Sequence, residues 1–197
     1  MNYLAHAYLS FGDPGILAGN MISDFVKGKK QFDYPESIQK GIRLHRMIDE
    51  FTDRHPATRT AKEYFKPAVG PYAGAFVDVA YDHFLSKDPN EFTAGSLQAF
   101  AEETYTKLDT QKDWFPERFA RMFPYMSSQN WLYNYRHTDG IEQSFGGVVR
   151  RASYLTDSLP AFKAFMEQYS FLQEQYNLFF PDIKNFASSQ FKVLQRQ

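Results

Sequence analysis

The sequence predicts an all-α protein, a single-domain helical bundle that spans residues 1–197. Prolines and cap-forming residues stand along the chain where helices are expected to begin and end. Apolar residues recur at three-and-four spacing, which is the pattern of one helix face. No segment alternates apolar and polar residues over the length of a strand, so we expect no sheet.

The prolines divide the first half of the chain into helices. Asp13 and Pro14 are a typical N-cap and first helical residue, and Gly28 is expected to close that helix. Pro35 opens the next helix, which should run to about Arg54. Further starts are expected at Pro56, Pro71, Pro116 and Pro160, with Thr93 and Ser128 as plausible caps.

Apolar stripes predict the helices of the second half. One stripe runs from Leu97 to Leu108, and a longer one runs from Phe162 to Phe179 and predicts one helix. Residues 29–34 and 87–90 are predicted to be short loops. The polar residues after about Ser188 are expected to fray.

Composition narrows the classes of function. The chain has no cysteine, which excludes disulfides, thiolate metal sites and a cysteine nucleophile. Any metal must therefore be held by His, Asp, Glu and water, a donor set that favours harder ions. The net charge of −1 does not indicate a nucleic-acid binder. No apolar run is long enough to span a membrane, and residues 1–10 do not resemble a signal peptide, so we expect a soluble, cytoplasmic protein.

Positive charge is concentrated in one region of the chain. Between Asn20 and Arg46 there are six basic and three acidic residues. This excess could steer an acidic partner, or it could be a solvated face. The basic residues are Lys27, Lys29, Lys30, Lys40, Arg43 and Arg46.

The strongest chemical signal is a histidine followed by acidic residues at helical spacing. His45 and Asp49 are four residues apart, and Asp53 is four further on, so all three lie on one helix face. Ile38 and Ile42 continue that face, which is therefore semi-buried. A buried charge without a partner is costly, and a metal ion would supply the partner. Asp53 could instead cap the following helix.

A second segment places acidic residues and a histidine in an apolar helix. Asp78 and Asp82 are four apart, and His83 follows Asp82 directly. Adjacent helical residues point about 100° apart, so Asp82 and His83 reach one site only if it lies between them. Asp78 could equally pair with an arginine.

Two further polar residues, His6 and Asp24, stand among apolar neighbours. A lone histidine on an apolar face is more often a hydrogen-bonded core residue than a ligand. Several segments, however, each place an Asp or His on an apolar stripe, and burying all of them without an ion would leave groups unpaired. Together they predict a shared metal site.

Five sequence blocks resemble the acyl carrier protein phosphodiesterases, bacterial enzymes that are also called acyl carrier protein hydrolases. The resemblance covers nearly the whole chain and is weakest between about residues 88 and 127 and after 158. The blocks are Asn2–His6, Gly19–Gly28, Leu44–Asp53, Asp78–Ser86 and Gln129–Arg136.

The resemblance implies a variant of the HD phosphohydrolase fold and a role in fatty acid and lipid metabolism. It implies hydrolysis of the phosphodiester that joins 4′-phosphopantetheine to a serine of holo-acyl carrier protein, with a divalent ion, typically Mn²⁺, although Mg²⁺ or another ion would serve. The adjacent pair reads Asp82-His83. That order is the reverse of the ordinary HD motif, so ligand roles cannot be copied from HD proteins by order along the chain.

A mechanism follows as a hypothesis. Arg46 would neutralise the phosphodiester, or would pair structurally with Asp49 or Glu50. The residues Lys27, Lys29, Lys30, Lys40 and Arg43 would dock the acidic carrier protein. Metal ligands would come from His6, Asp24, His45, Asp49, Asp82 and His83, and catalytic groups from Asp24, His45, Arg46 and Asp78.

Two other functions are open on the residues alone. The first is a helical HD-type phosphohydrolase that acts on nucleotides or small phosphoesters, because the same metal chemistry serves both substrates. The second is a non-enzymatic helical binding module whose buried His and Asp side chains are satisfied core groups. The sequence does not give the oligomeric state.

Overall fold

The computed structural model describes residues 1–93 and 95–196, and all of their regular structure is helical. The predicted all-α class is confirmed. The α-helices are α1 (Tyr3–Tyr8), α2 (Pro14–Ile22), α3 (Glu36–Arg54), α4 (Pro56–Val69), α5 (Ala73–Lys87), α6 (Ser96–Asp109), α7 (Glu117–Ser128), α8 (Trp131–Asn134), α9 (Thr138–Arg151), α10 (Leu159–Glu167) and α11 (Tyr169–Gln195). Short 3-10 helices are η1 (Ser23–Phe25), η2 (Gly28–Asp33), η3 (Gly70–Tyr72) and η4 (Lys112–Trp114).

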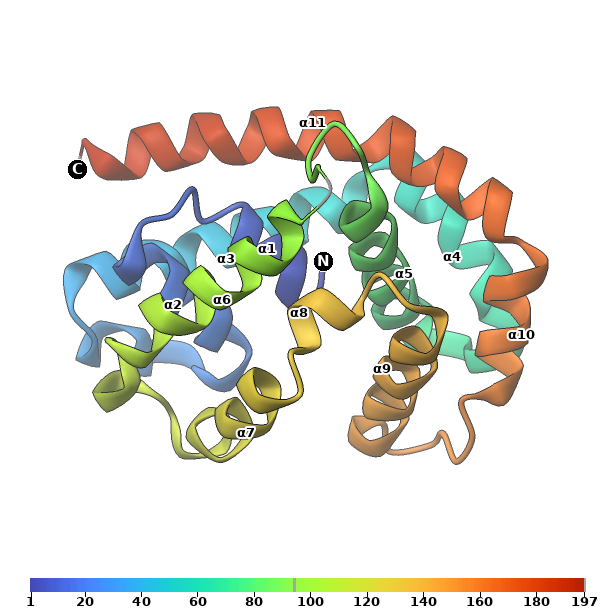
Figure 1. The fold of residues 1–197 in the computed structure, drawn as a ribbon, viewed down its shortest axis with the longest axis horizontal. Helices are drawn as coiled ribbons and strands as arrows, with labels where there is room; N and C mark the ends of the chain where they lie inside the picture. Colours follow the sequence, from blue (N-terminus) through green and yellow to red (C-terminus); the bar gives the residue numbers. More distant parts are fainter. Residues whose placement is uncertain (94, 197) are drawn as a thin grey trace.

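The long helix α11 lies across α3, α4 and α5 (Figure 1). Helices α4, α5, α9 and α10 gather at one end of α11, whereas α1, α2, α3 and α6 lie toward the other end (Figure 1). The chain begins between these two groups, beside α8 (Figure 1). The first residues are therefore placed where elements from both groups can meet.

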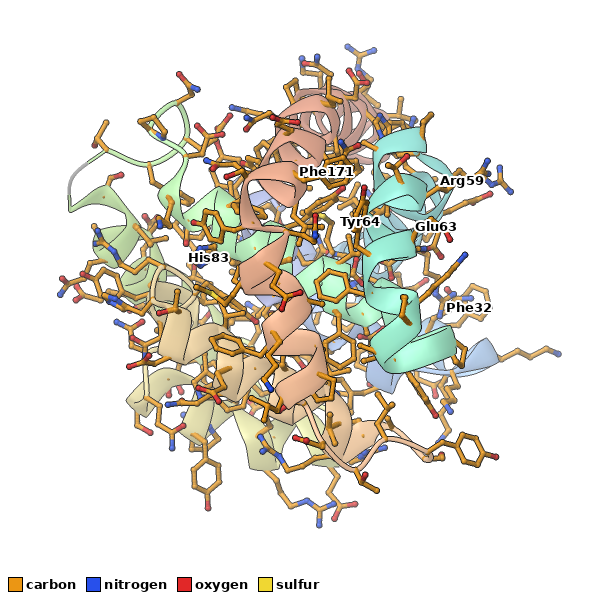
Figure 2. The ribbon with its side chains drawn as sticks, turned by 90° about the vertical axis from the view of Figure 1, so that its right-hand side faces the viewer. Phe32, Arg59, Glu63, Tyr64, His83 and Phe171 are labelled. Atoms are coloured by element: carbon orange, nitrogen blue, oxygen red, sulfur yellow. The ribbon has the colours of Figure 1, made fainter. Side chains whose placement is uncertain are left out.

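Aromatic side chains fill the core of the α4, α5, α9 and α10 group. The ring of Phe145 lies 4.8 Å from Phe76 and 5.9 Å from Phe65 and from Phe165, measured between centroids. Such edge-to-face contacts stabilise a core beyond the area they bury. At its edge, Tyr64 of α4 faces Phe171 of α11, with centroids 4.4 Å apart (Figure 2).

Helices α2 and α3 pack closely enough that only glycine fits at their crossing. A Cβ atom on Gly19 would lie 2.0 Å from the carbonyl oxygen of Ile38. A Cβ atom on Gly41 would lie 2.2 Å from the carbonyl oxygen of Ile16. The two backbones therefore touch, and this contact brings the end of α2 against the middle of α3.

Several predicted boundaries are wrong. Helix α2 ends at Ile22, and Gly28 instead opens η2, so residues expected to form a loop are 3-10 helical. Thr93 does not cap α6, which begins after the left-handed residue Gly95. Ser128 ends α7 and caps nothing downstream, since α8 follows Asn130.

The predicted single helix over 162–179 is also wrong. Helix α10 ends at Glu167 and α11 begins at Tyr169, with Gln168 between them. The expected fraying after Ser188 is not found, because α11 continues to Gln195 and buries Leu194. Within residues 1–93 and 95–196, no helix has the length and apolarity needed to cross a membrane.

Candidate metal centre

Two histidines and a carboxylate meet where α1 packs beside α3. His6 comes from α1, and His45 and Asp49 come from successive turns of α3. Each offers a ligand atom, and the three atoms lie within 4.8 Å of one another. The two imidazole rings stack with centroids 4.0 Å apart and planes at 14°. The four-residue spacing places His45 and Asp49 together on α3, and His6 from α1 completes the site.

Asn20, near the end of α2, fixes both rings. The Nδ1–H of His45 donates to the backbone carbonyl of Asn20 at 2.7 Å, because a carbonyl can only accept. The Asn20 side chain accepts from Nδ1 of His6 at 2.8 Å. It also donates from Nδ2 to the carbonyl of His6 and to Ser10 Oγ, which identifies its oxygen as the acceptor toward the ring. One residue thus assigns the Nδ1–H tautomer to both histidines.

The Nε2 atoms that remain are directed at carboxylates. Nε2 of His45 lies 3.0 Å from Oδ2 of Asp49, and Nε2 of His6 lies 3.2 Å from Oδ1 of Asp49. Among residues 1–93 and 95–196, Nε2 of His6 is buried and has no hydrogen-bond partner of acceptable geometry. Two imidazole lone pairs and a carboxylate around one point need a proton or a cation between them. The donor set therefore fits a divalent ion.

Asp24 lies at the solvent side of this cluster. It belongs to η1, directly after α2, and its Oδ1 lies 3.3 Å from Nε2 of His45. Its side chain is 73% exposed, whereas that of His45 is 7% exposed. Asp24 therefore has access to both the cluster and a molecule that approaches from solvent.

The electrostatics separate the two histidines. Burial, together with the neighbouring His45, lowers the pKa of His6 to about 4. Burial also opposes protonation of His45, but the Asp24 and Asp49 carboxylates outweigh it and raise the pKa of His45 to about 9. Burial favours the neutral form of Asp49, yet the Met1 amino group and both histidines hold its pKa below the ordinary value. Without a metal, His45 holds the proton that an ion would displace.

Asp82 lies beneath α1 and serves as its cap. Its fully buried carboxylate accepts from the backbone N–H groups of Asn2, Leu4 and Ala5 at 3.3, 2.7 and 3.2 Å. Burial raises the pKa of Asp82 to about 7 against the pull of these donors. Both oxygens are engaged by α1, so Asp82 positions the helix that carries His6.

His83 points in a different direction from Asp82. Its Nδ1 donates to the carbonyl of Tyr135 at 2.7 Å, and its Nε2 lies 2.9 Å from the hydroxyl of Tyr169. It is buried beside α10 and α11, and Figure 2 shows it well separated from Phe32, which lies beyond α4. The structure does not bring His83 into the cluster of His6, His45 and Asp49.

Asp78 lies next to the cluster. Its Oδ1 is 2.9 Å from the amino nitrogen of Met1, which is itself 3.6 Å from Oδ1 of Asp49. Burial raises the pKa of Asp78, and the Met1 amino group opposes the rise. Asp53 stands apart, because its Oδ1 pairs with Lys62 at 2.7 Å. The cap expected from Asp53 is supplied by His55, whose Nδ1 accepts from the N–H of Ala57.

Arg46 links α3 to the segment that carries Lys27, Lys29 and Lys30. Its guanidinium donates to Gln31 Oε1 at 2.8 Å and to the carbonyl of Val26 at 3.2 Å. It pairs with neither Asp49 nor Glu50 in the structure, and Glu50 instead pairs with Arg54 at 2.6 Å. Arg46 therefore holds η1 and η2 against α3.

The residues that were predicted to dock an acidic partner lie on this segment and on α3. Lys27, Lys29 and Lys30 are exposed on and before η2, and Phe32 on the same turn is 65% exposed. Lys40 is half-buried and pairs with Glu36 at 2.9 Å, while Arg43 is exposed on α3. Lys27 follows Asp24 by three residues, so the lysines begin directly after the segment that carries Asp24.

The sequence did not single out Asn20 as a functional residue. A buried asparagine four residues before Asp24, in the apolar helix α2, was the available signal. Its importance depends on the close contact between α2 and α3, which only the structure shows. The fold and the site define an all-helical protein with a histidine–carboxylate centre suited to a divalent cation.

Comparison with known proteins gives the particular family. The model of the acyl carrier protein phosphodiesterase family matches residues 1–183. The acyl carrier protein phosphodiesterase of Salmonella paratyphi A (strain ATCC 9150 / SARB42) is 34% identical over 182 residues, which cover 92% of this chain and 94% of that protein. The protein of the same name from Salmonella agona (strain SL483) is 33% identical over the same shares. No solved structure matches the chain.

The chain therefore belongs to the acyl carrier protein phosphodiesterase family. The resemblance carried by the five sequence blocks is confirmed, and so is the assignment to the phosphodiesterase class of hydrolases. The relation to the HD fold stays a prediction.

Proposed function

We propose that this protein hydrolyses the phosphodiester between 4′-phosphopantetheine and the serine of holo-acyl carrier protein, and that it acts in the cytoplasm. The observation that carries the proposal is the cluster of His6, His45 and Asp49, whose Nε2 and carboxylate atoms converge and whose tautomers Asn20 fixes. Membership of the family and the printed names of its relatives support the substrate.

The proposed metal is manganese, held by His6, His45 and Asp49 with Asp24 as an accessible fourth ligand. Imidazole nitrogen and carboxylate oxygen suit ions of this type, and the buried Nε2 of His6 supports the assignment. When bound, a divalent ion polarises a phosphoryl oxygen and lowers the pKa of a water molecule. Asp78 is proposed to position Asp49, and Asp82 is proposed to position α1, which carries His6.

The chain's own residues would direct the proton. Water attacks phosphorus, the bond from phosphorus to the serine oxygen breaks, and the phosphate leaves with the pantetheine arm. Asp24 is exposed and lies 3.3 Å from Nε2 of His45, so it is placed to accept a proton from the attacking water and return it to the serine oxygen. The products are apo-carrier protein and 4′-phosphopantetheine.

The exposed lysines beside Asp24 would receive the carrier protein. Acyl carrier proteins are small and acidic, so Lys27, Lys29 and Lys30 would speed encounter by electrostatic steering. Phe32, exposed among these charges, adds an apolar contact at the same turn. Because Arg46 holds the turn against α3, docking there would present the modified serine to the cluster.

Mass spectrometry of holo-carrier protein incubated with this protein and Mn²⁺ tests the proposal. The expected result is loss of the phosphopantetheine mass by the wild-type protein and retention of that mass by Asp24→Ala. Asp33→Ala is the matched control, because Asp33 is an exposed carboxylate on η2, and it should behave as wild type. No mass loss with wild type, or faster turnover of nucleotides than of holo-carrier protein, would contradict the proposal.

A further inference from the structure

A cavity of about 280 Å³ with both polar and apolar lining residues opens where α1 meets α7, α8 and α9. Asn2 and Tyr3 line it from the start of the chain, Gln129 and Asn134 from around α8, and Gln143 and Arg151 from α9. Met122 and Trp131 give it an apolar part. None of the residues assigned above to metal binding lines this cavity, so it is a separate feature.

The cavity nevertheless adjoins the metal centre through α1. Tyr3 lines the cavity, and His6, one turn later on the same helix, belongs to the centre. Burial raises the pKa of Tyr3, the Arg151 guanidinium opposes the rise, and the Asp24 carboxylate adds to it. Tyr3 and Arg151 both line the cavity, so the positive charge of Arg151 belongs to the same wall as the Tyr3 hydroxyl.

The lining has the chemistry of an amide-binding channel. Asn2, Gln129, Asn134 and Gln143 each have both an amide donor and an amide acceptor. Internal bonds hold part of this wall in place. The Trp131 indole N–H donates to Gln129 Oε1 at 2.9 Å, and Asn134 Nδ2 donates to the carbonyl of Gln129 at 2.8 Å. Arg151 supplies the positive charge that suits a phosphate.

We propose that this cavity binds the pantetheine arm of the substrate, with its phosphate at the part of the lining that Tyr3 and Arg151 form. The inference rests on the proposed function, since it deepens the substrate of the same site. Pantetheine has two amide groups, which match the carboxamides of the lining. Its dimethyl carbon matches the apolar part at Met122 and Trp131.

Two neighbouring glycines of α9 provide a test with a matched control. Gly147 lines the cavity and Gly146 does not. Among the described residues, a Cβ atom on Gly147 or on Gly146 would approach only the Arg150 guanidinium, at 3.6 and 3.5 Å, so both helical positions have room for a Cβ atom. Gly147→Phe should fill the cavity, whereas Gly146→Phe should leave it open.

Isothermal titration calorimetry with free pantetheine measures the affinity of the protein for this ligand and tests the inference directly. Wild type and Gly146→Phe should bind alike, and Gly147→Phe should bind at least tenfold more weakly. On holo-carrier protein, Gly147→Phe should raise KM more than it lowers kcat. Gln143→Leu is the second variant, to be used if Gly147→Phe does not fold. Gln143 is exposed on the same helix, and its replacement should also weaken pantetheine binding.

The outcomes separate the two proposals. Absence of pantetheine binding to wild type, or equal binding by Gly147→Phe or Gln143→Leu, overturns the cavity assignment whatever the activity. Tighter binding of adenosine monophosphate than of pantetheine at this site also overturns it. Pantetheine binding that Gly147→Phe weakens, without any cleavage of holo-carrier protein, supports the cavity and contradicts the proposed function.

Discussion

Replacing Asn20 by alanine tests whether one residue organises the metal centre. The side chain of Asn20 makes three buried hydrogen bonds, to His6 Nδ1, to the His6 carbonyl and to Ser10 Oγ, at 2.8, 2.9 and 3.0 Å. Each is worth about 1 kcal/mol, and Nδ1 of His6 is left buried without its acceptor, so Asn20→Ala should cost about 2–4 kcal/mol of unfolding free energy. The freed His6 ring should also lower Mn²⁺ affinity by about 10- to 100-fold.

Urea unfolding and Mn²⁺ titration would measure these two effects. Asn20→Asp keeps an acceptor for Nδ1 of His6 but loses both donors, so its metal affinity should fall less than that of Asn20→Ala. Asn185→Ala is the control, because Asn185 is exposed on α11 and far from the centre in sequence. Wild-type Mn²⁺ affinity in a folded Asn20→Ala variant would refute the reasoning.

Three further effects are expected. The carboxylates that raise the pKa of His45 to about 9 also make its proton compete with the metal, so Mn²⁺ affinity, measured by titration, should rise about tenfold per pH unit from pH 7 toward 9. The metal-free protein should lose stability in urea over the same rise, because a raised pKa stabilises fully only below the ordinary 6.5. Lys30→Glu should raise KM for carrier protein about tenfold without changing turnover of a small phosphodiester, whereas Lys163→Glu on α10 should change neither. Asp82→Ala should lower the unfolding free energy by about 3 kcal/mol, because three N–H groups of α1 lose their acceptor.

Local spacing predicted the part of the site that lies on one helix. His45 and Asp49 are four residues apart on α3, so their proximity follows from helix geometry alone. His6 was a candidate as a polar residue among apolar neighbours, but its stacking on His45 depends on how α1 packs. Asp82 fixes that packing from α5, through contacts that span nearly eighty residues of sequence. No local pattern contains such a contact.

Asp82 and His83 are neighbours in the sequence, but their side chains do not share one site. From α5, the side chain of Asp82 points to α1. The side chain of His83 points instead to Tyr135 and Tyr169. The break at Gln168 was hidden for a similar reason. The apolar spacing continues through it without a proline or glycine, while α10 and α11 each pack separately on α4.

Pulsed electron paramagnetic resonance of the Mn²⁺-loaded protein tests the central claim most directly, because it detects nitrogen atoms bound to the metal. The geometry predicts coupling to two imidazole nitrogens, from His6 and His45, in the wild-type protein. His6→Gln and His45→Gln should each remove one of the two couplings, and His83→Gln should remove neither. Absence of imidazole coupling in the wild type, or its loss in His83→Gln alone, would contradict the assignment of the metal centre.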